Sequence, residues 1–449
     1  MRGREMKLAG VARADPSRIA ICGIAKHVGR ARAETLHFRH APPGARFQNH
    51  TETHMPARRG SNGALVVAHV AGMIDLVALP VWVNTLIEHF HFDAQSAGAL
   101  ATAYLACAVL CSVCIAPLIT RVPGRLSAAA GFALAACGFG VAAHSASFVG
   151  MLGAHALAGL GIGCGLSVAH GAIGRSPNPH RLFALSHLAL ALFGVGYFAV
   201  VPALIAADGG AALFSAFVVL SGVAALALAL AWPARTSAGA AAADATSHPA
   251  APTATTGARL ERGCWSAIIG IVFMAVNQAM VFSFVQRIGL SRGFGDAHVN
   301  AVLVAVGLVN LLPPVLAALL QRKLDARNVA LAGPLAQALL AWVISNTTSF
   351  APYAVAVSLW VFAMIFTHTF LFGFLAKLDA SGRAVAYTPA MLMAGSALGP
   401  LLGGVLIVRF GFGALGVAAL VIGALSLLFF SRLRALAVAQ TAFDLPPAR

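Results

Sequence analysis

One acidic side chain stands apart from the rest. Of the 14 Asp and Glu residues, only Asp75 lies near the middle of a long apolar stretch, and no Lys or Arg lies inside any such stretch. A charge at the centre of a bilayer costs at least about 2.5–3.5 kcal/mol, so desolvation favours the neutral acid until water reaches it. A carboxyl group that takes up a proton on one side and releases it on the other is what proton coupling requires. The alternative is a permanently protonated Asp75 bonded to a neighbouring helix.

Imidazoles and amides form a second group of polar side chains in the apolar stretches. An imidazole can titrate near neutrality or bind a solute, and an amide can line a cavity, but both also serve as packing groups between helices. His69 precedes Asp75 by six residues, roughly 120° around a helix, so we expect no direct pair between them. The candidates are His69, His155, His170, His187, His368, Asn277, Gln278, Asn310 and Gln337.

The sequence gives little support for a metal site or a nucleotide-binding site. Cys107, Cys111 and Cys114 share one helical face; three thiolates can hold Cu(I), but we prefer the interpretation that these small residues let helices approach closely. The HFH triplet at 89–91 has no matching zinc ligands, clustered histidine boxes are absent, and no GxxxxGK[ST] loop binds ATP. We therefore predict no metal and no cofactor, with a proton gradient as the energy source.

The elements that must position these residues are membrane helices. The 449 residues are 59% hydrophobic and only 10% charged, whereas soluble domains are roughly 25% charged. The formal charge of +16 is spread between apolar stretches and not gathered on one face, so we expect no nucleic-acid partner. Apolar runs of about 20 residues span a bilayer, and they lack the alternation of a barrel strand. We find twelve runs, at about 63–87, 95–119, 126–143, 148–173, 182–206, 210–232, 265–286, 297–320, 328–345, 352–376, 384–408 and 411–431.

The chain divides these runs six and six. Residues 233–264 are rich in Ala, Thr, Ser, Gly and Pro, which is typical of a flexible linker. We predict a basic, disordered tail at 1–62, six-helix bundles at 63–232 and 265–431, and a cytoplasmic tail at 432–449. A further hypothesis is that translation starts at Met55, because nothing upstream of it indicates a fold.

Positive charge predicts the orientation. Only three of the 30 Lys and Arg residues fall in one set of alternate loops, namely Arg287, Arg292 and Arg409. By the positive-inside rule these loops are outside and both termini are cytoplasmic.

Basic residues also recur between the halves: Arg175 and Arg181 have the spacing of Lys377 and Arg383, 202 positions later, and Arg121 precedes Arg322 by 201. This indicates a duplicated six-helix unit, one known transporter design; the alternative is that inner loops are basic anyway.

Two motifs lie in the first half. The loop APLITRVPGR keeps three residues of the pattern Gly-x-x-x-Asp-Arg-x-Gly-Arg, namely Arg121, Gly124 and Arg125. It has Ala116 and Thr120 where the pattern has Gly and Asp. The fourth run contains HALAGLGIG, which supplies Gly159, Gly161 and Gly163 of the pattern Arg-x-x-x-Gly-x-Gly-x-Gly, with His155 at the Arg position.

A third motif lies in the eleventh run, where GSALGPLLGG matches Gly-x-x-x-Gly-Pro-x-x-Gly-Gly at Gly395, Gly399, Pro400, Gly403 and Gly404. With these motifs, residues 63–431 resemble the major facilitator superfamily. The resemblance implies two pseudo-symmetric bundles around a cavity lined by spans 1, 4, 7 and 10. It thereby favours His155, Asn277, Gln278, Thr367 and His368 as cavity residues. In family members that export drugs the third motif typically lies in span 5.

We therefore predict an all-α integral membrane protein with twelve transmembrane helices in two six-helix bundles. We expect a secondary transporter, a monomer in a bacterial inner membrane, that exports neutral or lipophilic solutes against protons with Asp75 as the coupling residue. Proton-linked uptake and a non-transporting sensor on the same fold are the alternatives. No constellation of catalytic residues points to an enzyme.

Overall fold

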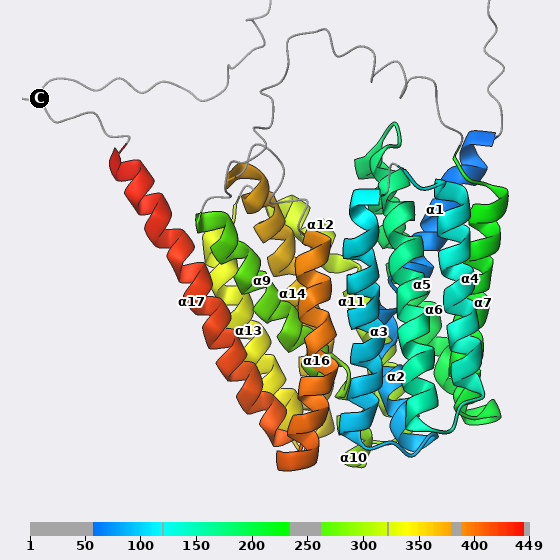
Figure 1. Ribbon diagram of the computed structural model, residues 1–449. Coiled ribbons are helices and arrows are strands. Elements are labelled where there is room, and N and C mark those ends of the chain that lie inside the picture. The colour runs from blue at the N-terminus through cyan, green and yellow to red at the C-terminus, as the bar shows by residue number, and fades with distance from the viewer. Residues whose placement is uncertain (1–56, 119–120, 234–261, 321–322, 379–387, 444–449) are drawn as a thin grey trace, which may run out of the picture. The chain divides into compact units, whose positions relative to one another are not determined.

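The computed structural model describes residues 57–118, 121–233, 262–320, 323–378 and 388–443 (Figure 1). The regular structure in these residues is helical, without strands, and twelve helical segments are long and apolar enough to cross a membrane. The prediction of an all-α protein with twelve spans is thereby confirmed. Residues 1–54, Met55, Arg322, Arg383 and most of the predicted linker lie outside the described residues.

Residues 57–233 form the N-terminal bundle, in which α5 packs against α3 and α4, and α7 packs against α4. Its core is aromatic: Trp82, Tyr104, Phe139, Phe214 and Phe217 are at most 1% exposed. Its helices are α1 (Ala57–Gly72), α2 (Asp75–Glu88), α3 (Ala94–Ile115), α4 (Gly124–Ala143), α5 (Phe148–Gly174), α6 (Pro179–Asp208) and α7 (Ala211–Leu230), with a short 3-10 turn η1 (Ala116–Leu118).

Residues 262–443 form the C-terminal bundle, in which α9 packs against α16 and α17, and α13 packs against α14 and α17. Its last helix runs past the predicted end of the span at residue 431, in a segment rich in strong helix formers. Its helices are α9 (Arg262–Phe282), α10 (Val285–Ser291), α11 (Asp296–Val309), α12 (Leu312–Leu320), α13 (Ala326–Asn346), α14 (Phe350–Leu378), α16 (Thr388–Phe410) and α17 (Gly413–Phe443).

Three predicted spans are interrupted helices. The first span breaks at Met73 and Ile74, between α1 and α2, and the seventh breaks at Ser283 and Phe284, between α9 and α10. The eighth breaks just before Pro313 and Pro314, which cannot donate to the preceding turn. A broken helix exposes backbone groups at membrane depth, and transporters use such half-helix ends at their binding sites.

The two bundles meet through α3 and α16 (Figure 1) and also through α6 and α11, where Gly307 lies against Val195. Gly98 lies against the backbone carbonyl of Pro400, Gly404 lies against that of Ala94, and the Thr102 hydroxyl accepts a 3.1 Å hydrogen bond from the Leu401 N–H. We call these contacts the outer seam, and we call the end of the helices where α2 ends and α3 begins the outer end.

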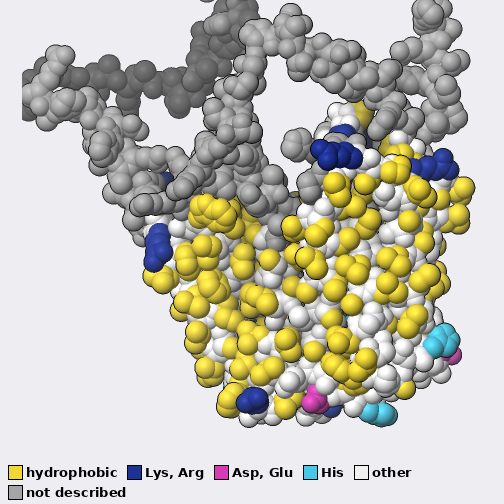
Figure 2. All heavy atoms as spheres, viewed as in Figure 1, with side chains coloured by type: hydrophobic (Ala, Val, Ile, Leu, Met, Phe, Trp, Pro, Cys, Tyr) yellow, Lys and Arg dark blue, Asp and Glu magenta, His cyan; other side chains and the backbone are white. Residues whose placement is uncertain are grey.

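The opposite end, the inner end, is less closely packed between the bundles. On the face of α3 that carries Gly98 and Thr102, the next residues towards the inner end, Ala106 and Val113, are exposed, Val113 by 60%. The face of α3 that is covered by α16 at the outer seam is therefore open in its inner half. Figure 2 shows apolar side chains covering the visible face between the two ends, with charged and His side chains near the ends.

Candidate functional site

Asp75 is the first residue of α2, directly after the break in the first span. It is 5% exposed, and the backbone N–H groups of Asp75 itself and Leu76 interact with its carboxyl group. Short side chains at this position can bond to the free N–H groups of a helix start, and the positive end of the helix dipole favours a negative charge there. The break in the helix therefore gives a buried carboxyl group local partners that an unbroken span would lack.

Tyr104 on α3 is another buried polar side chain of the N-terminal bundle. Its hydroxyl has no hydrogen-bond partner among the described residues, and its ring packs edge-on against Trp82, with the ring centres 4.9 Å apart.

His155 lies wholly inside the N-terminal bundle. It is 0% exposed; the Trp82 indole N–H donates to its Nε2 across 3.1 Å, and its Nδ1 lies 2.8 Å from the Met151 carbonyl oxygen. Both ring nitrogens therefore have partners within the bundle. The family resemblance suggests that His155 lines the cavity, and this role stays a prediction.

Three other histidines come together near the inner end of the N-terminal bundle. The Nδ1 of His69 on α1 lies 2.9 Å from the Nε2 of His170 on α5, and the ring of His187 on α6 lies 4.7 Å from that of His69, centre to centre. We call these three residues the histidine cluster. His368 on α14 belongs to the C-terminal bundle, where its ring packs beside Phe372 with the ring centres 4.9 Å apart.

The predicted amide and hydroxyl groups of the C-terminal bundle lie mostly inside it. Gln278 is half-buried and accepts a 3.1 Å hydrogen bond from Gln337 on α13. Asn277 is 1% exposed, and neither polar atom of its amide has a partner among the described residues. Thr367 is 2% exposed and donates to the Ala363 carbonyl oxygen at 2.7 Å. Of the five predicted cavity residues, only Gln278 and His368 are half-exposed.

The glycines of the motifs lie where helices approach closely. On α5, Gly159 and Gly163 lie against backbone carbonyls of α3, and Gly161 lies against the backbone of α4. A side chain at any of them would meet backbone atoms, so these glycines set the distance between the helices.

In the α16 motif, Gly395 and Gly399 lie against α9, and Gly403 packs beside Phe284. Gly404 and Pro400 instead belong to the outer seam. In the inner loop, Arg121 and Arg125 are exposed, and Gly124 packs against Trp232, the residue shortly after α7.

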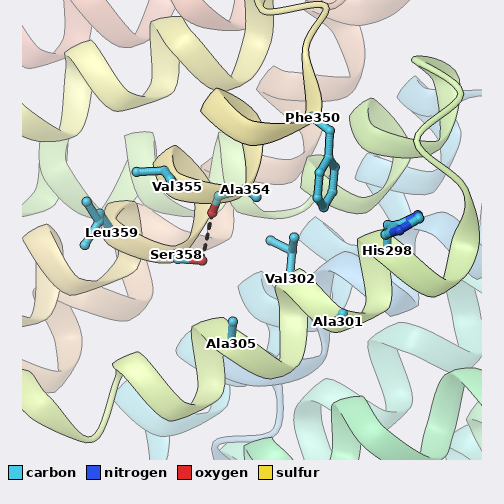
Figure 3. Close-up of a pocket in the computed structure, with 9 residues that line it drawn as sticks. All are labelled: His298, Ala301, Val302, Ala305, Phe350, Ala354, Val355, Ser358 and Leu359. Carbon is cyan, nitrogen blue, oxygen red and sulfur yellow. Dashed lines mark hydrogen bonds between the residues drawn. The ribbon is translucent and has the colours of Figure 1, made fainter.

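The described structure also has a groove of about 430 Å³ on the C-terminal bundle, between α11 and α14 (Figure 3). Its lining is almost entirely apolar, and its one hydroxyl, on Ser358, already donates to the Ala354 carbonyl oxygen at 2.8 Å. It includes neither Asp75 nor the histidine cluster, so we regard it as a lipid-facing surface feature. Its lining residues are His298, Ala301, Val302, Ala305, Phe350, Ala354, Val355, Ser358 and Leu359.

A family model with the description Major Facilitator Superfamily matches residues 64–380, from the first span through the tenth. The chain belongs to the Major Facilitator Superfamily. It is thus a membrane transporter of the secondary kind, which acts in a lipid bilayer on a small-molecule solute. No curated protein matches the chain.

Solved structures of other transporters share the fold. The nucleoside transporter NupG is 12% identical, with a TM-score of 0.61 over 87% of this chain and 100% of that one. A D-xylose-proton symporter is 15% identical, with a TM-score of 0.60 over 84% and 97%. The POT family transporter PepTSo is 13% identical, with a TM-score of 0.66 over 86% and 99%. At this level of identity the likeness concerns the fold.

Sequence reasoning did not find the histidine cluster, because it joins residues on three different helices. One signal was present in the sequence. His69, His170 and His187 all lie nearer the predicted inner end of their spans, whereas His155 lies nearer the outer end. Sorting the histidines by depth would have separated these three from His155.

Proposed function

We propose that this transporter couples the movement of a small organic solute to protons, and that Asp75 carries the coupling proton. The observation that carries the proposal is the position of Asp75: a buried carboxyl group at the break of the first span. Burial of a carboxyl group favours its neutral form, and its charge becomes tolerable when water enters. Alternating access supplies that change of environment twice in each cycle.

Export of neutral or lipophilic solutes in exchange for protons is the direction we propose. The described parts of the membrane helices hold no Lys or Arg in their middle, where an anionic solute would require one, and the α16 motif resembles exporter sequences. The charge distribution in the loops supports a cytoplasmic location for both termini, and we therefore propose that the inner end of the bundles faces the cytoplasm. We propose a monomer in a bacterial inner membrane.

Proton-linked uptake of an organic anion is the second candidate. It is favoured by one observation: the histidine cluster puts three imidazoles near the inner end, and protonated imidazoles can hold a carboxylate. The two candidates differ in the direction in which a solute moves relative to the proton.

Inverted membrane vesicles test the proposal. Vesicles containing the full chain would be energised until their lumen is acidic, and the pH gradient would be followed by quenching of a dye. Neutral, cationic and anionic organic compounds would then be added in turn to wild type, to Asp75→Asn and to Asp208→Asn. Asp208 is exposed at the outer end of α6, so its substitution removes a carboxylate away from the proposed site.

We expect at least one neutral or lipophilic compound to collapse the gradient in wild type and in Asp208→Asn, and to leave Asp75→Asn unaffected. If Asp75→Asn, present in equal amount, collapses the gradient as wild type does, Asp75 is not the coupling residue. If no compound acts on wild type, proton-linked export is wrong. Counterflow of an anion into right-side-out vesicles then distinguishes uptake from a sensor, which would carry no flux.

A further inference from the structure

The helices α3 and α5 stay in close contact from their middle towards the inner end. At Gly159 on α5, an added side chain would lie 3.1 Å from the Cβ of Cys107 on α3. One turn further along both helices, the Ser112 hydroxyl donates to the Gly163 carbonyl oxygen across 3.2 Å. Cys111 follows Cys107 by one turn on the same face of α3. The contact therefore brings the thiol of Cys111 to α5 beside Gly163.

Cys164, the residue after Gly163, is the partner of Cys111. The two side chains are hydrogen-bonded to each other. The Cys164 S–H donates to the Ser127 carbonyl oxygen on α4, 3.6 Å away, so Cys111 is the donor in the bond between the two sulfurs. Both thiols are free and half-buried. The pair thus joins two helices at the place where α3, α4 and α5 meet.

The neighbouring cysteines are placed differently. Residues four apart on one helix have Cβ atoms about 5–6 Å apart, which exceeds the spacing of about 3.5–4.5 Å in a disulfide, so Cys107 and Cys111 are poorly placed to join each other. Cys114 on α3 and Cys137 on α4 are exposed. The described residues contain no group of three His, Cys, Asp or Glu side chains placed to hold a metal ion. What the geometry offers is one pair of thiols.

We propose that Cys111 and Cys164 form a redox-active dithiol, which hydrogen peroxide converts into a disulfide between α3 and α5. One thiol loses its proton, and its sulfur attacks a peroxide oxygen; the O–O bond breaks, and the departing hydroxide takes up that proton as water. The sulfenic acid left behind is attacked by the second sulfur, the S–S bond forms, and the hydroxyl group leaves as water with the second thiol proton. The two sulfurs lose two electrons in total, and these reduce the peroxide to water.

The bond would fix the inner half of α3 to α5, beside the open face of α3 that carries Ala106 and Val113. If the inner end faces the cytoplasm, as we propose, the pair is a dithiol at rest, because the cytosol keeps thiols reduced. The bond would then form on exposure to oxidant and be reversed by thiol–disulfide exchange. This reversal in the cell rests on the proposed orientation, whereas formation of the bond does not.

Oxidation of the purified full-length chain tests the pair. One variant would retain only Cys111 and Cys164 of the seven native cysteines, and the matched control would retain only the exposed Cys114 and Cys137. Each would be reduced, treated with hydrogen peroxide and then alkylated. Intact mass would count the remaining free thiols, and non-reducing electrophoresis would separate bonds within one molecule from bonds between molecules. Peptide mapping of oxidised wild type would locate any disulfide without substitutions.

We expect the paired variant to lose both free thiols as one disulfide within the molecule, and a thiol reductant to restore both. The control should form oxides of its separate sulfurs without such a bond, although both are more exposed. Mapping of wild type should find Cys111 joined to Cys164, and Cys111→Ser should abolish that bond.

Three results would overturn the proposal. The first is that the two thiols stay free in the paired variant and in wild type. The second is that both sulfurs are oxidised separately without joining. The third is that the control pair forms its bond as readily, because exposure and not placement would then decide. None of these readouts involves transport, so they fail independently of the vesicle experiment.

Discussion

The outer seam and the histidine cluster are contacts of two different kinds at opposite ends of the molecule. At the seam, backbone meets backbone: Gly98 lies against Pro400, and Gly404 lies against Ala94. At the cluster, side chains of one chemical type meet, because His69 lies beside both His170 and His187. The seam therefore requires close fit, whereas contacts between imidazoles depend on which of them carries a proton.

The difference teaches which end of the molecule can respond to conditions. Close packing of a glycine against a neighbouring backbone depends on shape and is insensitive to pH or salt. A contact between imidazoles depends on their protonation as well as on their shape. A transporter that opens each end in turn can therefore close one end by fit alone and leave the other end sensitive to conditions. The substitutions below test that division.

The largest effect is expected from Gly404→Leu. An added side chain would meet the Ala94 carbonyl group and the Cα of Gln95 at the outer seam. Overpacking of this kind costs about 1–3 kcal/mol, which should shift the equilibrium towards molecules with separated outer ends about 5- to 150-fold. Spin labels through His89→Cys and Phe410→Cys would report the separation.

Gly222→Leu is the matched control, because a side chain at Gly222 on α7 would meet nothing within 4 Å. Its label distances should equal those of wild type. Unchanged distances in Gly404→Leu would show that the seam accommodates the larger side chain, and that close packing there does not keep the outer ends together.

Arg292→Gln should lower stability without opening the seam. Arg292 is half-buried in the C-terminal bundle and donates to carbonyl oxygens at the end of α13, those of Ser345 (2.7 Å), Asn346 and Thr347. A cation favours a helix C-terminus, and such charged hydrogen bonds contribute about 1.5–3 kcal/mol. We expect a Tm lower by a few degrees in detergent, with wild-type distances at the outer end. A wider outer distance would mean that stability within one bundle and closure of the seam cannot be separated.

The helices were predictable from the sequence, because a span requires a long run of apolar residues and that run is a local property. The break at Met73 and Ile74 was not. Among the residues flanking it, Pro80 is the obvious candidate for a kink, yet Pro80 lies inside α2 and the helix is interrupted seven residues earlier. Pro313 and Pro314, in contrast, do mark the break before α12. A helix break that is caused by packing against other helices has no local pattern in the sequence that would predict it.

The candidate site was predictable where one residue was unusual in itself. Asp75 is conspicuous as a lone charge in an apolar run, and the structure buries it. His155 and His69 look alike in the sequence, and only packing separates them: one donates and accepts within the aromatic core beside Trp82, and the other meets His170 from a different helix. Contacts between helices arise from the arrangement of the bundle, which residue spacing along one helix does not contain.

A smaller effect is expected from Thr102→Val, which keeps the shape of the side chain and removes its hydroxyl. The Leu401 N–H would lose its partner on α3, and a hydrogen bond of this kind contributes about 0.5–1.5 kcal/mol. The outer-open fraction should rise about two- to tenfold by the label distances described above. Thr102→Ser retains the hydroxyl and should resemble wild type; an equal rise in both variants would assign the effect to packing.

The smallest effect is expected from the one ion pair found in the described residues, Glu88 with Arg287. Both side chains are partly exposed, by 45% and 30%, and exposed pairs contribute only about 0.2–1 kcal/mol. Glu88→Gln or Arg287→Gln should therefore raise the outer-open fraction no more than about fivefold, and the effect should fade in high salt, which screens exposed charges. Exchange of the two charges, by Glu88→Arg with Arg287→Glu, should restore the wild-type fraction. If either single substitution opened the outer end as far as Gly404→Leu, the ion pair and not the close backbone packing would hold the seam, and the outer end would then be as sensitive to solution conditions as the histidine cluster.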